Sequence, residues 1–173
     1  MNRFSPGTPG GGGLGFAIQI YCDATVSCTD RDVIIDSPRR LLIEHLVAAF
    51  KTVTCYSGGF VIKAADHGHE HVGLGSTSTI ATAIVTAMNE ATCCPLSTEN
   101  VRMLIGHNYV EETEDDGKIA FGFETGVGSA ASIYGGMTLV GDRLTRICNH
   151  PFAEGKNVFI VIPKVHHEDN NAG

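Results

Sequence analysis

Basic residues are scarce in this chain. It has 12 Lys and Arg against 19 Asp and Glu among 173 residues, which gives a formal net charge of −7. An acidic chain is a poor candidate for general binding to nucleic acid or to anionic membranes. Phosphate binding stays open to it, because the backbone N–H groups at a helix N-terminus need no net positive charge. The sequence therefore predicts no nucleic-acid partner.

The chain also lacks the patterns of a secreted or membrane-spanning protein. No apolar run approaches the ~20 residues that cross a bilayer, and no signal-peptide pattern opens the sequence. None of the six cysteines forms a C-x-x-C pair, which argues against a zinc ribbon or a thioredoxin-type site. We expect reduced thiols and a cytoplasmic protein with no membrane partner.

Glycine, in contrast, is abundant. The chain has 21 glycines, with 43% hydrophobic and 18% charged residues, which is a composition typical of a folded protein with glycine in excess. Clustered glycine marks places where the backbone turns sharply or a ligand comes close. The clusters lie at 10–15, 73–75, 126–128 and 135–136.

Strand and helix patterns alternate along the chain, which predicts an α+β fold. Strands are expected at 16–26, 60–65, 119–125, 137–140 and 157–163, and helices after Ser37-Pro38, from Ser76 and after Ser97. The strand at 157–163 is expected to be buried, and only a polar segment follows it. We therefore expect an N-terminal domain over 1–155 and, at 156–173, the start of a C-terminal region that is largely missing.

A phosphate-binding loop is predicted just before the second helix. Its glycines let the backbone approach a ligand, and the first-turn N–H groups have no partner within the helix. The helix dipole adds about half a positive charge there. The alternative is a helix that is capped by Ser or Thr after a glycine turn; a Walker-type or dinucleotide motif is not matched. The expected contacts are Gly73, Leu74, Gly75, Ser76, Thr77 and Ser78.

A second glycine motif repeats this chemistry about fifty residues later. Two loops with small residues indicate two walls of one site, whereas the alternative is a tightly packed small-residue helix or turn. The expected ligand contacts in this second motif are Gly126, Val127, Gly128 and Ser129.

The two motifs, taken in order, resemble the GHMP small-molecule kinases. The run 71–76 (HVGLGS), the later 126–131 (GVGSAA) and Gly135-Gly136 are similar to one branch of that superfamily, the beta-ribofuranosylaminobenzene 5'-phosphate synthases. The early glycine strand resembles that branch as well, which makes Gly12 and Gly13 expected substrate contacts. The implied fold is the GHMP N-terminal domain, a ribosomal-protein-like two-layer sheet with helices.

What the resemblance implies about function is a sugar-phosphate enzyme of methanopterin biosynthesis. Such a synthase uses Mg²⁺, phosphoribosyl pyrophosphate (PRPP) and a hydroxy- or aminobenzoate, and it forms a C-riboside with loss of CO₂ and pyrophosphate. A homodimer is also expected. The alternative within the superfamily is an ATP-dependent sugar or small-molecule kinase. No aspartate matches the kinase catalytic base, which favours the transferase.

Two side chains near the loops are candidates for catalysis. Glu124 directly precedes the second motif, where it could contact a magnesium ion or the substrate, and His71 directly precedes the first. His71 also belongs to an alternating set with His67 and His69. With Asp66 and Glu70 nearby, such a set could instead bind zinc or another transition metal in a non-enzymatic module, or form a polar, partly exposed entry to the loop.

Overall fold

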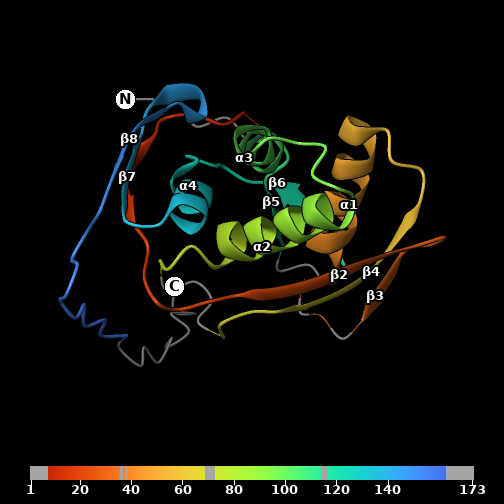
Figure 1. Cartoon of the computed structure of the whole chain (residues 1–173), viewed down its shortest axis with the longest axis horizontal. Coiled ribbons are helices and arrows are strands. Elements are labelled where there is room, and N and C mark those ends of the chain that lie inside the picture. Colours follow the sequence, from red (N-terminus) through yellow and green to blue (C-terminus); the bar gives the residue numbers. More distant parts are fainter. Residues whose placement is uncertain (1–7, 36, 38, 69–72, 114–116, 163–173) are drawn as a thin grey trace, which may run out of the picture.

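The computed structural model describes residues 8–35, 37, 39–68, 73–113 and 117–162, and Figure 1 shows their arrangement. Strands and helices alternate in it, so the predicted α+β class is confirmed. The elements, in order, are β1 Gly13–Phe16, β2 Asp23–Thr29, β3 Val33–Ile35, α1 Arg40–Thr54, β4 Gly59–Ala65, α2 Ser76–Ala91, α3 Thr98–His107, β5 Val110–Glu112, β6 Ile119–Phe121, α4 Val127–Tyr134, β7 Met137–Val140, a 3₁₀ turn at Asp142–Leu144 and β8 Arg146–His150.

The strands form two three-stranded sheets and one short hairpin. One sheet has the order β1-β7-β8 and is antiparallel throughout, so it joins the first strand to the last two. The other has the order β2-β4-β3, with β2 antiparallel and β3 parallel to β4. Strands β5 and β6 pair with each other.

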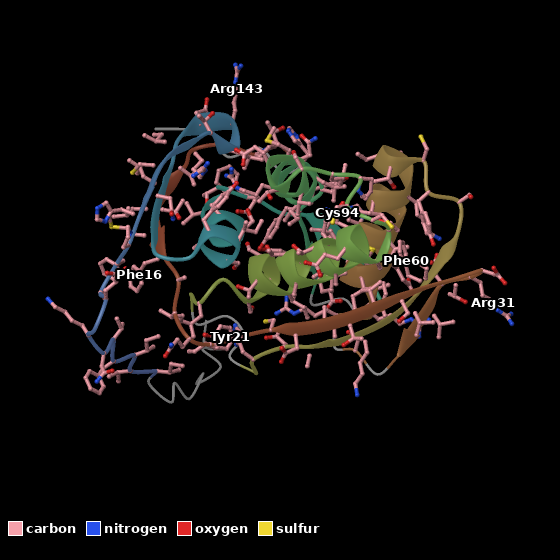
Figure 2. All side chains as sticks on the ribbon, viewed as in Figure 1. Phe16, Tyr21, Arg31, Phe60, Cys94 and Arg143 are labelled. Carbon is pink, nitrogen blue, oxygen red and sulfur yellow. The ribbon has the colours of Figure 1, made fainter. Side chains whose placement is uncertain are left out.

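Helices α2 and α4 connect the two sheets. Helix α2 packs on β2 and β4, helix α4 packs on β1 and β7, and the two helices pack on each other (Figure 1). The apolar stripe of α2 faces the core through Ile80, Ile84 and Met88, which are completely buried. Phe60 of β4 lies in the same interior (Figure 2), where its ring meets that of Phe50 at 5.9 Å between centroids.

Two of the three predicted helix starts agree with the structure. Helix α2 begins at Ser76, and Ser97 caps α3 by accepting a hydrogen bond from the backbone N–H of Asn100 at 3.2 Å. Helix α1 begins at Arg40 rather than at the predicted Ser37-Pro38; Pro38 lies outside the described residues. Its N-cap residue, Arg39, has left-handed backbone angles.

Two predicted strands are wrong. The run 16–26 is divided between β1 and β2, because residues 17–22 leave the first sheet and cross to the second. Phe16 and Tyr21 mark this crossing in Figure 2. Residues 157–162 form no strand and are largely exposed, with Phe159 and Val161 both 87% accessible, so the expected buried strand is absent from the described part of that segment.

Other boundaries differ less. The expected strand at 119–125 ends at Phe121, and β3, β5 and β8 did not stand out in the sequence.

Among the described helices, none combines the length and apolar character needed to span a bilayer. The domain boundary expected at residue 155 stays a prediction.

Candidate functional site

The first predicted loop leads into α2 with an open backbone. Gly73 and Gly75 have φ values of 78° and 67°, a left-handed conformation that glycine adopts without strain. A Cβ atom at either position would meet nothing within 4 Å, so the space beside the loop is free in the structure. The first intrahelical bond runs from the Thr79 N–H to the Gly75 carbonyl, which leaves the preceding N–H groups outside the helical pattern.

The second predicted loop forms the N-terminus of α4. Gly126 is its N-cap residue, with φ at 77°. Gly128, in the first turn, packs so closely on α2 that a Cβ atom there would lie 2.6 Å from Ser78 Cβ. The first turns of the two helices are therefore in direct contact. We call this contact between the first turns of α2 and α4, with Glu124, the α2–α4 junction.

Glu124 holds the junction together. Its Oε2 accepts a hydrogen bond from Ser78 Oγ at 2.7 Å, and its Oε1 accepts one from the Gly126 N–H at 2.6 Å. The residue is 4% exposed. Burial raises the pKa of the Glu124 carboxyl; the bonds from Ser78 and Gly126 and the charge of Arg102 act against that rise. Both oxygens are thus used to join the two helices.

Arg102 is a buried cation close to Glu124, and it was not among the residues predicted for the site. From α3, its Nη1 donates to Glu99 Oε1 at 2.8 Å and its Nη2 donates to the Leu144 carbonyl at 2.9 Å. Nη2 also lies 3.5 Å from the position of a Cβ at Gly126. A positive side chain therefore lies behind the N-terminus of α4.

Arg39 is a second buried cation, and it contacts the first loop. Its Nη1 donates to Thr77 Oγ1 at 2.7 Å and its Nη2 to Ser76 Oγ at 3.1 Å, while its Nε pairs with Asp66 Oδ2 at 3.2 Å. The side chain is 8% exposed. Arg39 thus orients the first two hydroxyls of α2, those of Ser76 and Thr77. No spacing motif pointed to it, because it lies 37 residues before Ser76.

A cavity of about 1560 Å³ opens beside the junction. Its walls include the crossing segment 17–22, the loop 73–75, and residues of α2 and α4. Tyr109 also lines it, and burial together with the nearby Glu111 carboxylate raises the pKa of the Tyr109 hydroxyl, which keeps it protonated. The cavity is large enough for a drug-sized or larger ligand.

Most of the predicted contacts come together here. The cavity lining includes Gly73, Leu74, Gly75, Ser78, Glu124, Val127 and Gly128. The remaining junction residues are Ser76 and Thr77, bound by Arg39, Gly126, whose N–H bonds Glu124, and Ser129, which is buried in α4.

Three predicted residues do not belong to this group. A Cβ on Gly12 would meet the Val140 carbonyl, and one on Gly13 would lie 3.3 Å from Val127 Cγ2, so both glycines allow close packing where β1 meets β7 and α4. His71 lies outside the described residues, as does His69. The role of His71 in catalysis or substrate contact and that of His69 in metal binding stay predictions.

The junction does not fit a magnesium ion held by the protein. Mg²⁺ prefers one or two free carboxylates and several waters. Glu124 is buried with both oxygens bonded, and the Ser76 and Thr77 hydroxyls accept from Arg39.

Comparisons with protein-family models, with curated proteins and with solved structures found no match to this chain.

Proposed function

We propose that this chain is the phosphate-binding domain of a PRPP-dependent C-ribosyltransferase of the GHMP-kinase-like superfamily. The observation that carries the proposal is the contact of two glycine-capped helix N-termini at Gly128 and Ser78. A single such terminus binds one phosphate group. Two in contact suit a pyrophosphate, which has two neighbouring phosphate groups.

The junction would act on the leaving group. As the bond between ribose C1 and the pyrophosphate oxygen breaks, the electron pair goes to that oxygen, and negative charge grows on the pyrophosphate. First-turn N–H groups of α2 and α4 and the two helix dipoles favour that charge. Glu124 and Arg39 would position these groups, since each bonds first-turn residues rather than open space.

The aromatic acceptor would occupy the cavity. The ring carbon that bears the carboxylate attacks ribose C1, and the electron pair of the departing CO₂ returns to the ring, so the product is a C-riboside 5'-phosphate. Tyr109 and Phe123 line the cavity beside Glu124 and offer aromatic contacts to a hydroxy- or aminobenzoate.

Isothermal titration with PRPP and with ATP, each with magnesium, tests the proposal. We expect saturable binding of PRPP at one site per chain. Binding of ATP alone would contradict the transferase and support the kinase alternative, with the same loop holding the ATP phosphates.

A matched pair of glycine variants localises the ligand. Gly75 and Gly117 both have positive φ, at 67° and 86°, and a Cβ at either meets nothing within 4 Å. Gly75→Val and Gly117→Val therefore carry similar backbone strain, but only the first places a side chain at the N-terminus of α2. We expect Gly75→Val to lose PRPP affinity and Gly117→Val to keep it. Equal affinity in both would mean that the loop is only structural.

A further inference from the structure

Three potential metal ligands lie together at the end of the β2-β4-β3 sheet. Cys22 directly precedes β2, and Asp66 and His67 directly follow β4. Strands β2 and β4 are antiparallel with Asp23 opposite Ala65, so the register brings these residues side by side. One donor atom from each of the three lies within 4.8 Å of the others.

The distances between the donors suit a small tetrahedral ion. Cys22 Sγ lies 3.8 Å from Asp66 Oδ1, and His67 Nδ1 lies 3.5 Å from the same oxygen. Around zinc, with bonds of about 2.0 to 2.3 Å, neighbouring ligand atoms are separated by about 3.3 to 3.7 Å. The two separations from Asp66 Oδ1 are within a few tenths of an ångström of these values, and the thiol and the imidazole offer donor atoms within 4.8 Å of each other.

The carboxylate is already oriented for such an ion. Asp66 Oδ2 pairs with Arg39 Nε at 3.2 Å, which leaves Oδ1 facing the thiol and the imidazole. Outer partners of this kind fix the ligands of metal sites. The Asp66 and His67 side chains are only 5% and 3% exposed, so the cluster is not a chance gathering of surface groups.

A thiol is a weak hydrogen-bond donor, so the hydrogen bond from Cys22 to Asp66 does not by itself explain why these residues lie together. Thiolate, imidazole and carboxylate together are the ligand types of zinc, and three protein ligands leave a fourth position open. Cys22 lines the large cavity, whereas Arg39 connects Asp66 to the first turn of α2.

We propose that Cys22, Asp66 and His67 bind one zinc-type transition metal ion, with its open position toward the cavity. On binding, the Cys22 thiol releases its proton to solvent and coordinates as the thiolate. The site is independent of the PRPP assignment. It uses one member of the alternating histidine set together with two residues outside that set.

Titration of the metal-stripped chain with Co²⁺ tests this proposal. We expect one ion per chain, a thiolate-to-cobalt charge-transfer band in the near ultraviolet, and displacement of Co²⁺ by Zn²⁺. Cys22→Ser should remove the band. Asp66→Asn and His67→Gln should weaken the binding of Co²⁺ at least tenfold, because each removes one of three ligands.

Cys148→Ser is the matched control, since Cys148 is an exposed free thiol on β8, in the other sheet. It should keep the band and the affinity. Far-ultraviolet circular dichroism checks that each variant folds. Metal binding by the wild-type chain tests the proposal even if a variant does not fold. A lack of saturable Co²⁺ and Zn²⁺ binding by that chain overturns the proposal. A band that persists in a folded Cys22→Ser variant overturns it too.

Discussion

Replacement of Gly128 by alanine is expected to force the first turns of α2 and α4 apart. The added Cβ would lie 2.6 Å from Ser78 Cβ and 2.8 Å from Ser78 Oγ. Packed carbon atoms prefer separations of about 3.5 to 4.0 Å. The obstacle is the base of a side chain on a helix, which no rotamer change can move, so one helix must shift by about 1 Å.

The net cost follows from two opposing effects. Overpacking of this kind destabilises a protein by about 1–3 kcal/mol. Alanine in place of glycine within a helix returns up to about 1 kcal/mol. We therefore expect the variant to lose about 1–2 kcal/mol of unfolding free energy, or roughly 2–8 °C in Tm for a chain of this size. PRPP affinity should fall about tenfold or more, because the two N-termini no longer face one ligand.

A double-mutant cycle with Ser78→Gly isolates the contact. Without the Ser78 side chain, the clashing atoms are absent, and the substitution at Gly128 should cost nothing or stabilise the protein. The coupling energy from urea unfolding should reach at least about 1 kcal/mol. An equal cost of Gly128→Ala in both backgrounds would refute the reasoning, because the destabilisation would then come from elsewhere.

Three further substitutions test the supporting contacts. Burial raises the pKa of Glu124 above its ordinary 4.5, so the wild type should lose unfolding free energy as pH rises from that value through the raised pKa. Glu124→Gln should flatten this pH dependence in urea unfolding. Equal slopes in the wild type and the variant would contradict the raised pKa of Glu124. Arg39→Ala should cost about 3–5 kcal/mol of unfolding free energy by removing the cation that pairs with the buried Asp66 Oδ2, and adding Asp66→Asn should recover part of it. Ser97→Ala should cost about 1 kcal/mol by removing the α3 cap, whereas Ser97→Asp should keep it.

The starts of α2 and α3 could be predicted because local chemistry determines them. A glycine turn followed by Ser76 and an apolar stripe, and a capping Ser97 before Val101 and Leu104, each occur within one or two helical turns. The close approach of the two glycine motifs was also inferred from their shared chemistry, and the contact of Gly128 with Ser78 agrees with it.

The wrong predictions involve choices that only tertiary structure makes. Alternation of apolar residues along a strand shows which residues share a face of the sheet. It does not show where the chain leaves one sheet for another, and here the chain leaves the first sheet after Phe16. The run 157–163 is predicted as a buried strand because of its apolar residues, yet its described part, 157–162, pairs with no strand among the described residues. No local pattern indicates the roles of Arg39 and Arg102, because the described partners of Arg39 are distant in sequence and Arg102, besides its local pair with Glu99, bonds Leu144, 42 residues later.

The two arginines also show how an acidic chain could bind an anion at the α2–α4 junction. Each is already paired with a carboxylate, Arg39 with Asp66 and Arg102 with Glu99, so neither supplies an uncompensated charge. Both oxygens of Glu124 accept hydrogen bonds at the junction, from Ser78 and from Gly126, so this carboxyl group is directed to donors of the protein. On the proposed binding mode, a ligand would be bound by first-turn N–H groups of α2 and by those of α4 other than Gly126 and Val127, which bond Glu124 and Thr125. Such binding would depend on the spacing of α2 and α4, and therefore on the fit of Gly128 against Ser78, rather than on net charge.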